Sequence, residues 1–194
     1  SRSKILPGRA ASSGTSASLP VSGRRSPYTP GMSDGTAPRL ESFELDHDRV
    51  RAPYVRLAAR HVGARGDVIT KFDLRLVQPN EAEIPTAALH TIEHLLAGYL
   101  RAALPDATIV DASPMGCRTG FYLTVLGEPT EESVRDAFVT ALGAVAGHEG
   151  PVPGCDRRTC GNWRDHSLPG ARAWAGSVLE REVVVQATVT IGAP

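Results

Sequence analysis

Residues 68–103 read VITKFDLRLVQPNEAEIPTAALHTIEHLLAGYLRAA, and this stretch decides the fold. In its first ten residues Phe72, Leu74 and Leu76 alternate with polar side chains. A period of two predicts a strand with one apolar and one polar face. After Pro85 the apolar residues recur at steps of three and four, which predicts an amphipathic helix. The stretch therefore predicts a strand followed by a helix that covers a sheet.

The flanking sequence extends this pattern in both directions. Residues 54–62 predict another strand, which a turn at 63–67 joins to residues 68–77 as a hairpin. Beyond the helix the sequence predicts strands at 107–110 and 121–126, helices at 130–146 and 169–182, and a final strand at 183–191. This order predicts an α+β fold, a largely antiparallel sheet with helices packed on one side.

Length and composition limit the domain organisation. A chain of 194 residues with 41% hydrophobic residues suits one globular domain, which we expect at 39–194. Residues 1–38 are rich in Ser, Gly, Pro and Arg without a periodic apolar pattern, which predicts a disordered or non-native leader. Met32 within this leader is a candidate start of the natural chain.

Charge and cysteine content indicate the surroundings in which the protein works. Basic and acidic residues are equal at 21 each, so nothing favours nucleic acid or an anionic membrane as a partner. No apolar run approaches the roughly 20 residues that a membrane helix needs. Three cysteines, an odd number, argue against a disulfide framework and favour a reducing cytoplasm.

The strongest chemical motif is His90-Thr-Ile-Glu-His94 on the predicted helix. At about 100° per residue, positions four apart lie about 40° apart, so His90 and His94 can direct two imidazoles at one ion. Glu93 lies close enough to act on a molecule bound there. This is the inverted zincin pattern, in which the histidine pair binds metal and the glutamate is a base. Two solvated histidines on a surface helix are the alternative.

A metal site and a thiol base need further residues. Two histidines require a third ligand, and Cys155 or Cys160 in the loop after residue 147 can supply a thiolate. His166 is a weaker candidate. Cys117 lies between Gly116 and Gly120, which allow a tight turn, and a thiolate there can serve as base or nucleophile.

Eight short blocks, in the right order from about residue 41 to the last helix, resemble the LuxS family. They are ESFELDH at 41–47, APYVR at 52–56, KFDLR at 71–75, QPN at 78–80, HTIEHLL at 90–96, SPMGC at 113–117, GEP at 127–129 and CGN at 160–162. Because so many blocks match in order, this resemblance is far more specific than the H-x-x-E-H pattern alone.

The resemblance implies a LuxS-like metalloenzyme fold and S-ribosylhomocysteine lyase activity, which yields homocysteine and 4,5-dihydroxy-2,3-pentanedione, the autoinducer-2 precursor. By position it implies metal ligands His90, His94 and Cys160, an acid/base pair Cys117 and Glu93, and substrate-binding residues Ser42, His47 and Arg75. It also implies one divalent metal per subunit, with ferrous iron expected and zinc or cobalt able to take its place after purification, and a homodimer with active sites at the interface. Cys155 matches no family site.

Two other functions fit the residues alone. An inverted-zincin metallopeptidase would use Glu93 to activate water against a peptide bond and would not need Cys117. A domain with a structural zinc would close the site with four ligands, including both Cys155 and Cys160.

Overall fold

The computed structural model describes residues 41–192, which belong to one compact unit. The predicted leader at 1–38 lies outside the described residues. The strands are β1 (Tyr54–Val62), β2 (Val68–Arg75), β3 (Thr108–Pro114), β4 (Gly120–Leu126) and β5 (Val184–Val185). The helices are α1 (Glu41–Glu44), α2 (Thr86–Ala103), α3 (Glu131–Ala146) and α4 (Leu168–Leu179).

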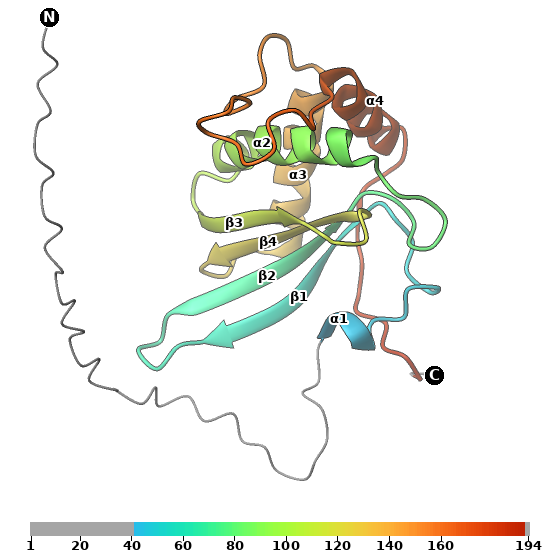
Figure 1. Ribbon diagram of the computed structural model, residues 1–194. Helices are drawn as coiled ribbons and strands as arrows, with labels where there is room; N and C mark the ends of the chain where they lie inside the picture. Colours follow the sequence, from blue (N-terminus) through green and yellow to red (C-terminus); the bar gives the residue numbers. More distant parts are fainter. Residues whose placement is uncertain (1–40, 193–194) are drawn as a thin grey trace, which may run out of the picture. The chain divides into compact units, whose positions relative to one another are not determined.

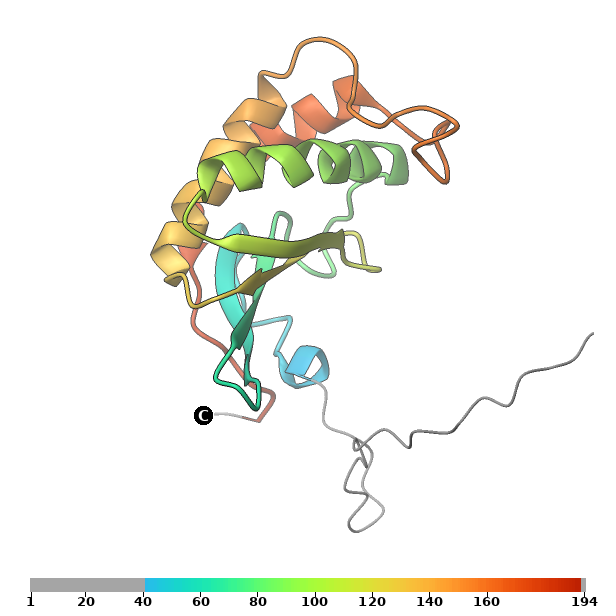
Figure 2. The same ribbon diagram turned by 90° about the vertical axis from the view of Figure 1, so that its left-hand side faces the viewer.

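The five strands form one sheet in the order β3-β4-β2-β1-β5, antiparallel except for the β1–β5 pair. Helices α2, α3 and α4 pack against one another and lie over one face of this sheet (Figures 1 and 2). The predicted α+β class, with a largely antiparallel sheet and helices on one side, is confirmed. None of the helices in residues 41–192 combines the length and the apolar character that a membrane span requires.

The core forms where the periodic apolar faces predict it. Phe72 and Leu74 of β2 are buried against the helices, together with Ile92 and Leu96 of α2. Helix α3 begins after Thr130, whose hydroxyl accepts a hydrogen bond from the Ser133 amide at 3.1 Å. Burial of one helical face therefore fixes α2 on the sheet and leaves its histidines on the opposite side.

The last predicted strand, 183–191, is mostly not a strand. Only Val184 and Val185 pair with β1, and the chain then leaves the sheet. Further on, the Asp46 amide donates to the Val189 carbonyl, and the Ile191 amide to that of Glu44. The backbone hydrogen bonds of this segment are divided between two partners, β1 and the residues around Leu45.

The polar face of β2 is buried, although the alternation of apolar and polar residues along the strand does not predict this burial. Asp73 and Arg75 are 0% and 1% exposed. The segment just before β1 lies on this second face of the sheet, where Leu45, Val50 and Tyr54 form a smaller apolar cluster. A charged strand face is thus enclosed by the N-terminal part of the described chain.

Gly120 at the start of β4 permits the close pairing of β4 with β2. A Cβ atom at this position would lie 2.3 Å from the Leu74 carbonyl oxygen and 3.0 Å from the Arg75 Cα. Both are backbone atoms of the paired strand, so Gly120→Ala should lower the free energy of unfolding by about 1–3 kcal/mol. Urea denaturation measures this. Gly116→Ala, where an added Cβ meets nothing within 4 Å, is the control, and equal stabilities would contradict the packing argument.

Candidate active site

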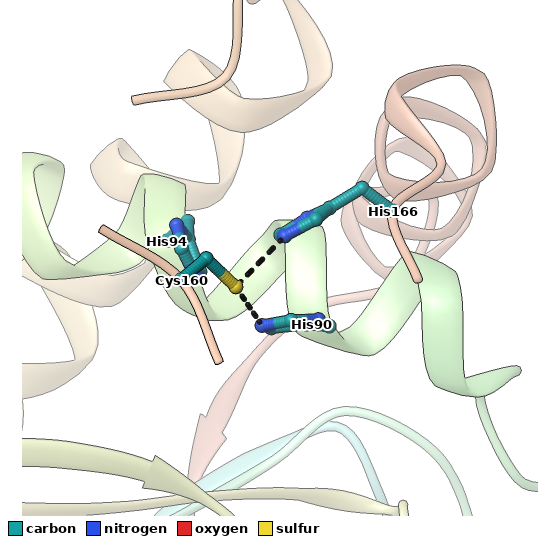
Figure 3. Close-up of side chains that lie close together, drawn as sticks. All are labelled: His90, His94, Cys160 and His166. Atoms are coloured by element: carbon teal, nitrogen blue, oxygen red, sulfur yellow. Dashed lines mark hydrogen bonds between the residues drawn. The ribbon is translucent and has the colours of Figure 1, made fainter. Parts of the chain in front are cut away.

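Four side chains from α2 and the loop before α4 converge on one point (Figure 3). They are His90, His94, Cys160 and His166, and their ligand atoms all lie within 4.8 Å of one another. The histidines of α2 are one turn apart, as the motif predicts. Of the predicted ligands, the structure brings all three together and adds His166 to them.

Backbone carbonyls orient the two helix histidines. His90 Nδ1 lies 2.9 Å from the Asp165 carbonyl oxygen, and His94 Nδ1 lies 2.8 Å from that of Pro153. A carbonyl only accepts, so each Nδ1 carries the hydrogen and each Nε2 keeps its lone pair. Hydrogen bonds of this kind typically hold a metal-binding histidine in the correct tautomer.

The donor set fits a divalent transition metal. Imidazole nitrogen and thiolate sulfur suit zinc, cobalt and ferrous iron. An ion bound tetrahedrally, with a nitrogen at about 2.1 Å and a sulfur at about 2.3 Å, separates these two atoms by about 3.6 Å. Cys160 Sγ lies 3.5 Å from His90 Nε2. These two donor atoms are therefore spaced as they would be around one ion.

His166 has an environment that favours its neutral form. Burial lowers the pKa of its imidazole, nearby His90 and His94 lower it further, and Asp165 opposes them. Neutral imidazole is the form that binds a metal.

The other residues of the two motifs lie outside this set of ligand atoms. Glu93, half-buried on α2, precedes His94 and contributes no ligand atom to the cluster. Cys155 directs its thiol toward the Trp163 carbonyl oxygen, 3.6 Å away. A closed site built on both Cys155 and Cys160 is thus not what the described residues form.

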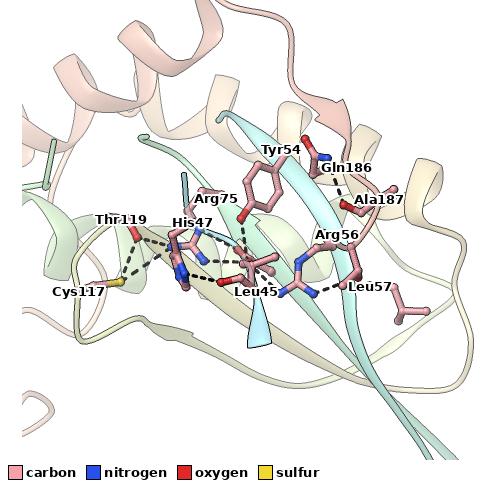
Figure 4. Close-up of polar contacts among 12 residues, drawn as sticks. Leu45, His47, Tyr54, Arg56, Leu57, Arg75, Cys117, Thr119, Gln186 and Ala187 are labelled. Atoms are coloured by element: carbon pink, nitrogen blue, oxygen red, sulfur yellow. Dashed lines mark hydrogen bonds and ion pairs between the residues drawn. The ribbon is translucent and has the colours of Figure 1, made fainter. Parts of the chain in front are cut away.

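Cys117 belongs to a second group of residues, on the loop between β3 and β4 (Figure 4). Its exposed sulfur lies 3.1 Å from Thr119 Oγ1 and 4.0 Å from Arg75 Nη1. These three residues and His47 line a cavity of about 560 Å³, whose lining includes none of the four clustered side chains. Ser42 lies half-buried on α1 and is not part of that lining.

A buried ion network holds Arg75 beside Cys117. The Asp73 carboxylate accepts hydrogen bonds from Arg75 Nε and Nη2, at 3.1 and 2.8 Å, from Arg56 Nη2 at 3.3 Å and from the Tyr54 hydroxyl at 3.1 Å. Burial acts to lower the pKa of Arg75, but the hydrogen bonds and charge of Asp73 outweigh it and raise the pKa. Arg75 is therefore a fixed cation at the thiol.

Asp73→Asn should destabilise the protein, because two buried guanidinium groups would lose their shared counter-charge. We expect a loss of about 3 kcal/mol in the free energy of unfolding, measured by urea denaturation. Glu128→Gln is the control, since its ion pair with Arg60 is about half exposed on both sides and should contribute less than about 1 kcal/mol. Similar losses in both variants would show that the buried network is not the stabilising feature.

Some site residues were not singled out from the sequence. Asp73 and Thr91 lie inside quoted blocks, and Thr119 follows Cys117 by two positions. Their side chains contact other functional residues, so only the paired strands and the packed loop reveal them. A position within or next to a conspicuous motif is the one sequence signal that points to these three residues.

Comparison with known proteins gives a consistent family. The sequence model described as S-Ribosylhomocysteinase (LuxS) matches residues 40–189. A Thermus thermophilus protein named S-ribosylhomocysteine lyase is 60% identical over 154 residues, which cover 79% of this chain and 97% of the relative. Proteins of the same name from Deinococcus deserti and Pediococcus pentosaceus are 55% and 56% identical, over 78% and 73% of this chain and 97% and 90% of their own.

Proposed function

Because the chain belongs to the LuxS family of S-ribosylhomocysteine lyases, we propose how its two groups of residues carry out that reaction. The chain is a carbon–sulfur lyase that acts on S-ribosylhomocysteine. The proposed mechanism rests on one observation: the chain has two separate groups of site residues. One is a cluster of nitrogen and sulfur donor atoms, and the other is a cysteine beside a buried arginine. A peptidase needs the first group but not the second.

We assign the metal to His90, His94 and Cys160. When bound there, a divalent ion acts as a Lewis acid that polarises a carbonyl of the open-chain ribose and acidifies the neighbouring C–H. We propose ferrous iron as the native metal. Affinity order alone places zinc above ferrous iron, so the iron assignment follows the family resemblance.

Cys117 and Glu93 then move the protons. One base takes a proton from the carbon beside the carbonyl and a proton returns to the former carbonyl carbon, which shifts the carbonyl from C1 to C2 and then to C3. Loss of the C4 proton places its electron pair between C4 and C5, and the C5–S bond breaks to release homocysteine as a thiolate. The remaining enol becomes 4,5-dihydroxy-2,3-pentanedione. We assign Glu93 to the elimination end.

The cavity at Cys117 positions the sugar. Asp73 and Thr119 take up three hydrogen-bonding directions of Arg75, with the Nη1 to Thr119 Oγ1 distance at 2.6 Å. The guanidinium is thus held rigidly and presents its charge to the thiol and to a sugar oxygen or carboxylate. His47 lines the same cavity, and we propose it as a substrate contact together with Ser42.

We propose a homodimer with its active sites at the interface. Two observations support it: the metal cluster and the Cys117 cavity are lined by different residues, and the large side chains Phe43 and Trp163 are 74% and 38% exposed. We also propose the cytoplasm as its location, because a thiol base and a thiolate ligand both need reducing surroundings.

Turnover of S-ribosylhomocysteine tests the proposed function. Purified protein reconstituted anaerobically with ferrous iron should release one free thiol for each substrate consumed, and a thiol reagent measures it. A panel of unmodified peptides should remain intact. Peptide cleavage without thiol release would contradict the lyase assignment and favour the metallopeptidase.

A further inference from the structure

The buried ion network on the second face of the sheet carries one positive charge more than it has counter-charges. Arg56 and Arg75 are 2% and 1% exposed, and both donate to the Asp73 carboxylate, at 3.3 and 2.8 Å. Within residues 41–192, Asp73 is the one acidic side chain that pairs with either guanidinium group. Tyr54 adds a hydrogen bond but no charge, because burial raises the pKa of its hydroxyl. Two cations therefore share one anion away from water.

Arg56 is the less satisfied of these two cations. Its Nη2 contacts Asp73 and its Nη1 donates to the Thr188 hydroxyl at 3.3 Å, but its buried Nε has no hydrogen-bond partner in the described part of the chain. A buried charge with an unmet donor costs stability, and an apolar side chain of similar size would avoid that cost. Packing alone thus gives no reason for a guanidinium at this position, and its charge needs a functional explanation.

Cys117 can supply the missing negative charge. Contacts run without a break from Cys117 through Arg75 and Asp73 to Arg56 (Figure 4). If Asp73 served Arg75 alone, the pair would be neutral and would attract a thiolate only weakly. Because Asp73 is shared with Arg56, a net positive charge faces the sulfur, and a thiolate at Cys117 makes the group of four neutral.

We infer that Arg56 is a positioning residue for the reaction: by sharing Asp73, it leaves Arg75 the charge that holds Cys117 as a thiolate. This inference rests on the proposed role of Cys117 as a base and deepens it. A thiol must lose its proton before it can accept one from the sugar. Arg56 therefore sets the pH range in which the enzyme works, although it does not line the Cys117 cavity.

The other charged or titratable side chains around the thiol lie at the surface of its cavity. They are His47, Glu81, Glu83 and Arg118. Glu83 pairs with Arg118 at 3.4 Å, and the two side chains are 60% and 38% exposed, so solvent screens their charges. The contacts of Arg56 include none of these four residues. Its replacement therefore removes one buried charge and leaves the charges that face the thiol in place.

Alkylation of Cys117 by iodoacetamide as a function of pH tests the inference in the metal-loaded full chain. Peptide mass spectrometry follows Cys117 and, in the same sample, Cys155, a thiol outside the network. Arg56→Met and Arg56→Gln both remove the charge and leave Asp73 paired with Arg75, so both should fold. The pH of half-maximal alkylation should rise by about one unit at Cys117, as expected for loss of one charge at an effective dielectric constant of about 20, and should not change at Cys155.

Thiol release from S-ribosylhomocysteine gives the second readout. In the neutral Arg56 variants it should fall about tenfold on the acidic side of the pH profile and recover as the pH rises. Arg56→Lys keeps the charge and should keep both profiles. Arg60→Met removes an arginine from the same strand, but its ion pair with Glu128 is about half exposed, so screening by solvent should leave both profiles unchanged.

Three results would overturn the inference. The first is an unchanged Cys117 profile in a folded neutral variant of Arg56, and the second is thiol release lowered equally at every pH. The third requires no variant to fold: in the unaltered chain, Cys117 would react at the same pH as Cys155. If the unaltered enzyme still releases homocysteine, the proposed function stands and only the role of Arg56 is lost. Absence of that release would instead contradict the proposed function, whatever the alkylation profiles show.

Discussion

Cys117→Ala is expected to release homocysteine about 10²–10⁴-fold more slowly than the unaltered enzyme, because it removes a positioned general base. Its metal content should stay the same, since the sulfur is outside the ligand cluster. The fold should also persist, because Cys117 is exposed on a loop and the substitution leaves no cavity in the core. Thiol release under saturating substrate, with metal analysis of the same sample, measures both quantities.

Two comparisons make this result specific. Cys155→Ala, which removes a thiol from outside both groups of site residues, should keep the full rate. Glu93→Gln should also stop thiol release while the metal remains, yet still allow ketose intermediates to accumulate if Cys117 carries the early proton transfers. A Cys117→Ala enzyme that releases homocysteine at the unaltered rate would rule out the two-base mechanism.

Cys160→Ala is expected to lose most of its bound metal and, with it, nearly all thiol release. The thiolate is the single sulfur ligand in the cluster, and loss of its charge removes the strongest electrostatic attraction for a divalent ion. His90→Ala and His94→Ala should also lose metal, because each removes a nitrogen donor from the same cluster. Metal analysis by mass spectrometry after gel filtration gives the stoichiometry for each variant.

The matched control is again Cys155→Ala, five residues earlier in the same loop. Its thiol contacts the Trp163 carbonyl oxygen and lies outside the cluster, so its metal content should equal that of the unaltered chain. Full metal content in Cys160→Ala, or metal loss in Cys155→Ala, would contradict the assignment of Cys160 as the sulfur ligand.

The individual strands and helices could be predicted because each depends on the regular spacing of its apolar residues. Alternation around Phe72 and the helical steps from Leu89 to Leu96 determine which faces are apolar, and the structure buries those faces. The end of the chain could not be predicted in the same way. Val184 and its neighbours favour extended backbone, but whether such a segment joins a sheet depends on which partner strand has free hydrogen-bonding groups.

The same distinction between local patterns and non-local contacts applies to the active site. Two histidines one helical turn apart are a local pattern, so His90 and His94 could be identified as a pair from the sequence. The approach of His166 depends on a loop that folds back over α2. Burial of Asp73 depends on a segment more than twenty residues away in the sequence. Non-local contacts of this kind have no signature in spacing or composition.

Carbon NMR of labelled S-ribosylhomocysteine during turnover is the sharpest test of the proposed carbonyl migration. With the label at C2 of the ribose, we expect a ketone signal that appears at C2, diminishes as the carbonyl moves to C3, and is followed by the signal of the five-carbon dicarbonyl product. Free homocysteine should rise in step with that product. Two results would contradict the carbonyl migration. The first is homocysteine release by the unaltered enzyme with no ketose signal in that enzyme or in Glu93→Gln. The second is an unchanged substrate spectrum in the iron-loaded protein.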